Sequence, residues 1–229
     1  MTKKTVVIHQ PDFLPYLGFF HRLLHVDLFV VLDNVQFLRR GWHHRDKIKT
    51  PQGDSWISLG VVKSSQQTSI NNIILSNNDW KKKHLNIIKQ NYKTSKYFDE
   101  IFPYIKELYS NNFEKMIDFN LKSISILMEL FDIKINMEFS SKYNLNTRAN
   151  ELLVDILNEV DATHYLSGIG AKDYFKSEVF DKANIEVIWQ NFKHPIYPQP
   201  YGEFIPYLSS IDMLFNCGVE ESRKILREI

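Results

Sequence analysis

Short runs of β-branched and other aliphatic residues, each closed by polar residues, recur along the chain and predict buried strands. The first run covers residues 5–8 and ends at His9-Gln10, and the second covers residues 28–32 and ends at Asp33. The apolar spacing between them is helical over residues 17–26, which predicts a parallel strand–helix–strand unit. Further strands are expected at residues 70–75, 133–139, 164–166 and 185–189.

Two other patterns lie between these strands. Polar and aromatic residues alternate on both sides of the turn sequence Pro51-Gln52-Gly53-Asp54, which predicts a β-hairpin. A helical insert is expected over about residues 78–131, with its second and third helices following around Pro103 and Asn111-Asn112. Thr147 is expected to cap an amphipathic helix over residues 148–160, and two closing helices are expected at residues 209–215 and 220–229. Together these elements predict a single three-layer α/β domain over residues 1–229.

Composition and charge narrow the class of protein. The net charge of +1 gives no indication of bulk nucleic-acid binding. The lone cysteine, Cys217, excludes an intramolecular disulfide framework and a multi-cysteine metal site, and we expect it to be buried and inert. No apolar run reaches the roughly 18 to 20 residues of a membrane span. Because residues 1–4 lead straight into a strand rather than a signal-peptide core, a cytoplasmic protein is expected.

Polar residues at three strand ends form the candidate site. In open α/β sheets, ligands bind outside the carboxyl ends of parallel strands. His9, Asp33 and Ser167 take such positions, and we predict that they are the catalytic residues. The Ser167-Gly168-Ile169-Gly170 loop would present backbone N–H groups and a helix N-terminus to a phosphate or carboxylate. Each residue alone has a second interpretation, since a strand-ending Asp often stabilises a turn and a single His is often structural.

A basic and aromatic segment follows the second strand. Arg39, Arg40 and Arg45 are suited to bidentate phosphate contact, and Trp42 to stacking on a base or sugar. A solvated loop whose charges pair with nearby acids is the alternative. His43 and His44 are adjacent rather than at a helical metal-binding spacing, so no zinc site is expected.

A second loop rich in proline and tyrosine covers residues 195–207. Its residues Tyr197 and Gln199 are expected to form a lid or pocket wall that contacts substrate. The proline content also suits a rigid structural connection.

Several of these segments resemble the WbqC-like family. The resemblance lies in residues 8–18, in residues 32–37 with Arg45, in Tyr165-Leu166-Ser167-Gly168 with Gly170, and in residues 208–216 with Gly218. It covers nearly the whole chain. It implies a bacterial protein associated with O-antigen, capsule or other surface-glycan genes. Gln10, Tyr16 and Gln36 lie in these segments and are expected to contact substrate, together with Gly168 and Gly170.

A weaker resemblance is to the nucleotidyltransferase-like (HUP-like) α/β superfamily, which implies a core of that kind. In that superfamily a Gln-Pro sequence precedes two phosphate-binding histidines. Here Tyr16 and Phe19 stand at the histidine positions, which makes ordinary nucleotidyl transfer doubtful.

The leading functional hypothesis is an enzyme that forms an amide on the amine of a nucleotide-linked amino sugar, by acyl or aminoacyl transfer. His9 would be the general base, Asp33 would orient it, and Ser167 would hold the donor carbonyl. The donor would be a thioester, an aminoacyl carrier or an acyl-adenylate. No other cofactor is assigned, and nucleic acid enters only if the donor is an aminoacyl-tRNA.

Two further classes remain open. One is a nucleotide-sugar, glycosyl or nucleotidyl transferase, although the chain has no Asp-x-Asp sequence for a metal. The other is a non-catalytic binding protein of a glycan-assembly complex, which aromatic-rich loops would suit. The oligomeric state is left open.

Overall fold

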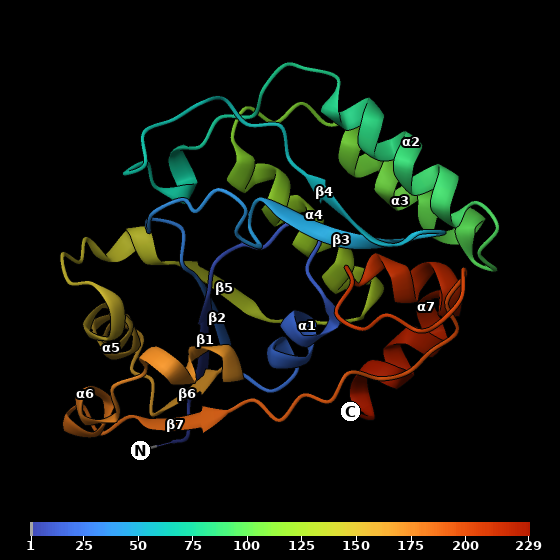
Figure 1. Ribbon diagram of the computed structural model, residues 1–229. Coiled ribbons are helices and arrows are strands. Elements are labelled where there is room, and N and C mark those ends of the chain that lie inside the picture. Colours follow the sequence, from blue (N-terminus) through green and yellow to red (C-terminus); the bar gives the residue numbers. More distant parts are fainter. Residues whose placement is uncertain (1) are drawn as a thin grey trace.

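The computed structural model describes residues 2–229, and its centre is a five-stranded sheet with the strand order β5-β2-β1-β6-β7 (Figure 1). Every neighbouring pair of strands is parallel, which confirms the predicted parallel sheet. Counted within this sheet alone, the order is 3-2-1-4-5, the arrangement of doubly wound folds that bind nucleotides at the reversal point. The reversal lies between β1 and β6. The strands are β1 (Thr5–His9), β2 (Leu28–Val31), β5 (Asn136–Phe139), β6 (His164–Ser167) and β7 (Glu186–Trp189).

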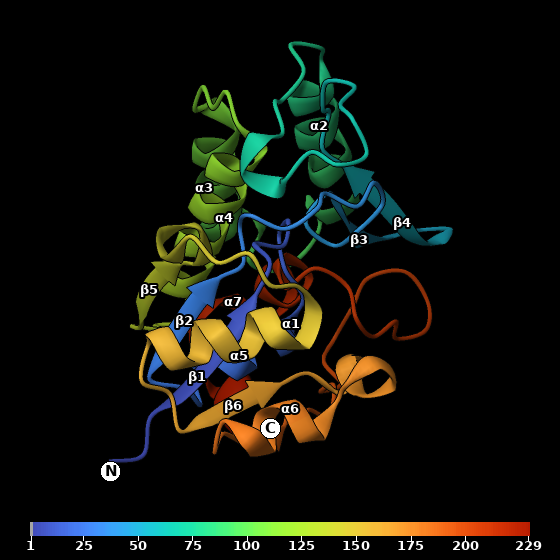
Figure 2. The same cartoon turned by 90° about the vertical axis from the view of Figure 1, so that its left-hand side faces the viewer.

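Helices cover both faces of the sheet, as the continuous apolar character of the strands predicts. Along β1, Val6 and Ile8 pack on one side with residues of α5 (Ala149–Glu159) and α6 (Ser177–Lys182). Val7 points to the other side, where residues of α1 (Leu17–Leu23), α4 (Met116–Leu130) and α7 (Ile211–Arg227) belong to the core. Figure 2 shows α5 lying across β1 and β2. The three-layer α/β class is therefore confirmed.

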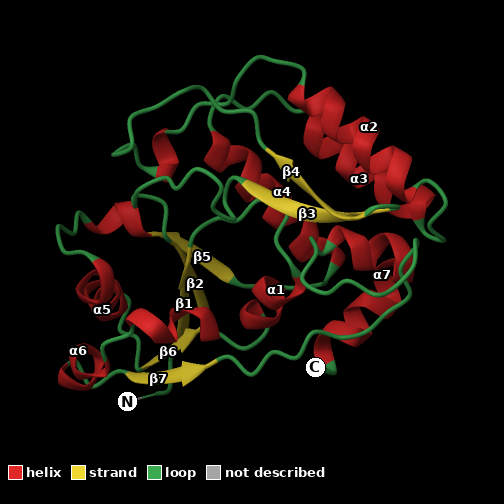
Figure 3. Cartoon of the chain, viewed as in Figure 1, coloured by secondary structure: helices red, strands yellow, loops and turns green. Residues whose placement is uncertain are grey.

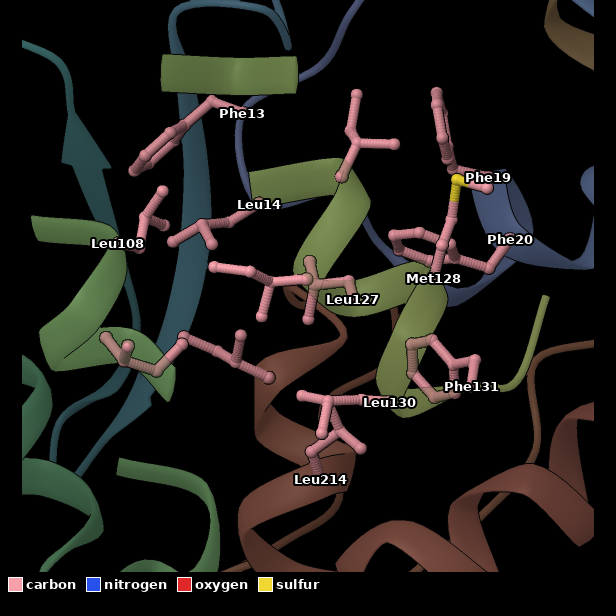
Figure 4. Close-up of a cluster of buried hydrophobic side chains, with 14 of the residues drawn as sticks. Phe13, Leu14, Phe19, Phe20, Leu108, Leu127, Met128, Leu130, Phe131 and Leu214 are labelled. Carbon is pink, nitrogen blue, oxygen red and sulfur yellow. The ribbon is translucent and has the colours of Figure 1, made fainter. Parts of the chain in front are cut away.

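The larger of the two cores joins the sheet to the predicted helical segment. Phe19 and Phe20 of α1 meet Leu127 and Phe131 near the C-terminal end of α4, together with Leu214 of α7 (Figure 4). The other helices of this segment are α2 (Trp80–Tyr92) and α3 (Phe98–Ser110), within the predicted limits.

The predicted hairpin stands apart from the main sheet (Figure 3). It consists of β3 (Arg45–Thr50) and β4 (Gly53–Ser58), which pair antiparallel with Thr50 opposite Gly53. Gly53 has a φ of 111°, which favours glycine at this turn.

Two local predictions were wrong. Residues 70–75 do not form a strand: Ile70–Asn72 is a 3₁₀ turn, and Ile74 and Leu75 make only isolated bridges. Thr147 does not cap α5, because the N-cap is Arg148 and the Thr147 hydroxyl donates to Asp155 at 2.5 Å. In both cases a contact with another part of the chain outweighs the structure that the residue types favour locally, a strand for residues 70–75 and a helix cap for Thr147.

The closing helices form one element, α7, with non-helical backbone at Gly218. Gly218 has a φ of 76°, and a Cβ at this residue would lie 2.6 Å from the Tyr97 ring. The predicted break between residues 215 and 220 therefore appears as a kink inside a helix. None of the helices in residues 2–229 has the length and apolar character that a bilayer crossing requires.

A buried asparagine holds the segment that leaves β1. The side-chain amide of Asn120, in α4, donates to the carbonyls of Pro11 and His43, both at 2.8 Å. Leu14, three residues after Pro11, adopts a φ of 43°, a left-handed conformation that costs a non-glycine residue about 1–2 kcal/mol. The Ser209 hydroxyl donates to the Leu14 carbonyl at 2.6 Å. Contacts from α4 and from the residues before α7 therefore fix this segment.

Asn120→Ala is expected to lower the free energy of unfolding by about 2–4 kcal/mol, because two buried carbonyls lose their donor. Urea denaturation measures this change. Asn91→Ala is the matched control, because its amide bonds only to the Ile87 carbonyl within α2, and it should stay within about 0.5 kcal/mol of wild type. A loss for Asn120→Ala as small as the control would show that this anchor is dispensable.

Candidate functional site

A cleft of about 870 Å³ opens where β1 and β6 end, at the reversal point of the sheet. This volume lies in the range of small-molecule sites. Residues from both strand ends line the cleft, with others from the start of α5 and from the loops around Trp42 and Phe192. Because ligands of open α/β sheets bind at the carboxyl ends of strands where the strand order reverses, this cleft is the candidate binding site.

The cleft has a polar interior and an apolar rim. Asp12, Arg22, Ser167 and Gln190 line it and are all buried, and His9 lies among them half-buried. Around the opening, five large hydrophobic side chains are exposed: Leu38, Trp42, Ile169, Tyr174 and Tyr207. Such a lining suits a ligand with its polar group innermost and a flat or apolar part outside.

His9 ends β1 and stands in the cleft as a neutral imidazole. Its Nδ1 lies 2.9 Å from the Gln10 carbonyl, which fixes Nδ1–H as a donor and leaves Nε2 as the acceptor. Burial, reinforced by the charge of Arg22, lowers the pKa of His9 to about 3. The imidazole edge also packs on Phe19, with ring centroids 5.4 Å apart.

Asp12 is the carboxylate beside His9. Its Oδ2 lies 3.6 Å from Nδ1 of His9. Burial raises the pKa of Asp12 to about 7, and the charge of Arg22 opposes that rise. At neutral pH, Asp12 therefore exchanges a proton readily while His9 stays a neutral imidazole, a separation typical of acid–base sites.

Arg22 comes from α1 and lies buried against β6 and β7. Its Nη1 donates to Oε1 of Gln190 at 3.4 Å. The Gln190 amide in turn donates to the Gly18 carbonyl at 2.8 Å, which fixes its orientation. Among residues 2–229, Nη2 of Arg22 has no hydrogen-bond partner.

Seven of the residues predicted from sequence line this cleft: His9, Gln10, Tyr16, Trp42, Ser167, Gly168 and Gly170. The amide oxygen of Gln10 accepts a hydrogen bond from Nδ1 of His43 at 2.8 Å. Tyr16 packs edge-on against Phe192, with ring centroids 5.9 Å apart. The other seven, Asp33, Gln36, Arg39, Arg40, Arg45, Tyr197 and Gln199, are not among the lining residues.

Asp33 does not pair with His9. One of its carboxylate oxygens accepts bonds from the Ser140 hydroxyl and the Ser141 N–H, and the other accepts from the Asn71 amide. These bonds tie the end of β2 to two neighbouring segments. The carboxylate that reaches His9 comes instead from Asp12, on the same chain segment.

The basic segment lies mainly on the surface. Arg39 and Arg40 are exposed, and the Arg45 guanidinium stacks 3.8 Å from the centroid of Trp56. The Gln36 amide donates to the Gln66 carbonyl. The exposure of Arg39 and Arg40 agrees with a solvated loop, but within residues 2–229 neither they nor Arg45 form the ion pairs with acids that this alternative included. Of the predicted residues in this segment, Trp42 lines the cleft.

Tyr197 and Gln199 belong to a separate buried network around Asp212. The Gln199 amide donates to Asp212 at 2.8 Å, and the Tyr92 hydroxyl donates to the other oxygen at 2.8 Å. Burial raises the pKa of Asp212 to about 6. The Pro-rich loop is thus fixed at this point, and Tyr207 at its end contributes to the cleft instead.

The helix expected after Gly168 is only a 3₁₀ stretch, Ile169–Tyr174. The predicted dipole at a helix N-terminus is therefore not available, because it requires an aligned α-helix.

Burial raises the pKa of Cys217 to about 11, which agrees with an inert thiol. No group of three or more His, Cys, Asp or Glu side chains within residues 2–229 is arranged to hold a metal ion.

Sequence reasoning missed Asp12, Arg22 and Gln190. Asp12 lies within residues 8–18, one of the segments that resemble the WbqC-like family, but nothing in its residue type or spacing distinguished it from the residues around it. Arg22 interrupts an otherwise apolar helix, Leu17-Gly18-Phe19-Phe20-His21-Arg22-Leu23, and a charge on such a helix was an available signal.

Asp12→Asn is expected to become more stable relative to wild type as the pH rises from 4 to 8. The pKa of Asp12 is about 7 in the folded chain and near 3.8 when unfolded, so the folded state binds more protons between these values. Stability therefore falls with rising pH across this window, by about 4 kcal/mol at most, and the substitution removes that loss. Melting temperatures measured across the range test this.

The exposed Asp161, which already has a φ of 51° that asparagine tolerates, provides the control variant Asp161→Asn. Its melting temperatures should follow those of wild type. Parallel curves for Asp12→Asn and wild type would contradict the raised pKa.

Comparison with known proteins gives the family. The model of the WbqC-like protein family matches residues 10–224. The uncharacterized protein Rv1507c of Mycobacterium tuberculosis (strain ATCC 25618 / H37Rv) is 31% identical over 220 residues, which is 95% of each chain. No solved structure matches the chain. This protein belongs to the WbqC-like family.

Proposed function

We propose that this protein is an enzyme of bacterial surface-polysaccharide biosynthesis that forms an amide on the amine of a nucleotide-linked sugar. The surface-polysaccharide context rests on the resemblance to the WbqC-like family. The reaction rests mainly on one observation: His9 and Asp12 lie side by side in the cleft with their pKa values displaced in opposite directions.

Asp12 is the better general base of the two. A carboxylate with a pKa of about 7 can take the first proton from the sugar ammonium at neutral pH. The freed amine then attacks the carbonyl carbon of the acyl donor, and the new N–C bond forms as the carbonyl becomes a tetrahedral oxyanion.

His9 handles the second proton. Its Nε2 accepts the proton that the attacking nitrogen loses, and the resulting imidazolium is strongly acidic because of its low pKa. It therefore passes the proton to the leaving group as the bond between the carbonyl carbon and that group breaks. The products are the amide, the protonated leaving group, a neutral His9 and a protonated Asp12, which releases its proton to solvent before the next turnover.

The rest of the cleft suits a nucleotide-linked sugar. Trp42, Tyr174 and Tyr207 offer exposed aromatic faces at the opening for a base or sugar ring. The donor carbonyl would lie toward the end of β6, near the buried Ser167. The donor is proposed to be a thioester, an aminoacyl carrier or an acyl-adenylate.

A second candidate function, nucleotidyl or glycosyl transfer, is favoured by one specific observation. The 3-2-1-4-5 strand order with a cleft at its reversal point is common to nucleotide-binding folds. Mass spectrometry of nucleotide-linked amino sugars after incubation with each donor class separates the two. Acylated sugar supports amide formation, whereas released nucleotide or pyrophosphate without acylation supports the alternative.

Asp12→Asn is expected to lower kcat for the acyl transfer by about two to four powers of ten, because the variant cannot accept a proton. KM should change only a few-fold. In wild type, kcat should rise as the pH increases through about 7, where Asp12 becomes ionised, and the variant should lose this rise. Steady-state kinetics across the pH range gives all three quantities.

Asp33→Asn is the comparison variant for the carboxylate. Because the bonds of Asp33 go to Ser140, Ser141 and Asn71, it should lose stability while kcat stays within a few-fold of wild type. If instead kcat falls for Asp33→Asn and not for Asp12→Asn, the assignment of the base to Asp12 is wrong.

A further inference from the structure

Arg22 is a buried cation without a counter-charge. Only 5% of the residue is exposed, and it forms no ion pair with any carboxylate of residues 2–229. A guanidinium stays charged at every accessible pH, so it cannot escape the cost of burial by losing a proton. A buried charge of this kind requires a partner.

The nearby carboxyl groups compensate the charge of Arg22 only in part. Burial raises the pKa of Asp12 to about 7 and raises the pKa of Asp46 well above its usual value. Asp12 would have a depressed pKa if it were the ion-pair partner of Arg22. Within residues 2–229, the one side-chain hydrogen bond of the guanidinium goes to Gln190, a neutral amide.

Gly168 shows that the position of the guanidinium is built into the cleft. A Cβ at this residue would lie 2.5 Å from Nη1 and 3.8 Å from Cζ of Arg22, the two atoms of the described residues within 4 Å, apart from Gly168 and its neighbours in the chain. The backbone does not require glycine here, because φ is −72° and ψ is 147°. The absence of a side chain therefore lets Arg22 lie against the strand end, where it lines the cleft.

We propose that Arg22, which lines the cleft, is its anion-binding residue and that the guanidinium binds a phosphate or carboxylate group of the ligand. Planar guanidinium N–H groups match the oxygen spacing of both anions, and a partly buried site strengthens such bonds. This role replaces the one expected for Arg39, Arg40 and Arg45, of which none lines the cleft.

The assignment deepens the proposed function without depending on its chemistry. A phosphate would belong to the nucleotide-linked sugar or to a donor that carries phosphate, such as an acyl-adenylate, and a carboxylate would belong to a sugar or an acyl chain with a free carboxyl group. Binding of small anions separates the two groups, since inorganic phosphate and pyrophosphate carry only the first and acetate only the second.

Isothermal titration calorimetry at low ionic strength tests the proposal with these three anions. Wild type is expected to bind phosphate and pyrophosphate, or acetate, depending on which group the site accepts. Arg22→Gln should weaken that binding about 30-fold or more, because the charge-assisted bonds are lost. Arg227→Gln, at a site on α7 where the guanidinium bonds to Asp132, is the charge-matched control and should bind as wild type does.

Gly168→Ala provides a second variant that keeps the arginine. Its Cβ displaces only the end of a flexible side chain, so the fold should persist, as circular dichroism can show. Anion affinity should fall about tenfold because the guanidinium moves.

Two results would overturn the proposal: no binding of any of the three anions to wild type, or equal binding by Arg22→Gln and wild type. Neither result bears on amide formation, since these titrations contain no amine and no acyl donor. Conversely, if no acylated sugar is found, anion binding that depends on Arg22 would still support the role of Arg22.

Discussion

The two hydrogen bonds from the Asn120 amide to the carbonyls of Pro11 and His43 hold together the parts that make the cleft. The chain leaves β1 through Gln10 and Asp12 and must turn sharply, with Leu14 in a left-handed conformation. A buried donor from α4 and a hydroxyl from Ser209 stabilise that path. Without them, the positions of His9 and Asp12 relative to the end of β6 would not be fixed.

The cleft carries electrostatic costs that the remaining structure must offset. Burial favours the neutral forms of His9 and Asp12 and leaves Arg22 charged without an ion pair in residues 2–229. Such groups lower stability, and they persist at sites that bind or react. The two hydrophobic cores on either side of the sheet provide the compensating stability.

Loop residues that look suited to binding can serve the fold instead. Tyr197 and Gln199 enclose Asp212, and Arg45 lies on Trp56, so their polar groups are engaged within the protein. Asp33 is held in the same way by Ser140 and Asn71. In each case the residue type was right for ligand contact, but a closer internal partner already satisfies it.

The sequence alone determined the parallel strands, the hairpin, the helical segment, and His9 and Ser167 as lining residues, because these follow from apolar periodicity and from where strands end. It could not determine which strand ends meet. The reversal of strand order lies between β1 and β6, so Ser167 shares the cleft with His9, whereas Asp33, which follows β2, does not line it. Burial was also undetermined, and it is burial that raises the pKa of Asp12 and encloses Arg22, which has no ion pair within residues 2–229. Both depend on contacts between residues far apart in the chain, and only the folded structure brings those residues together.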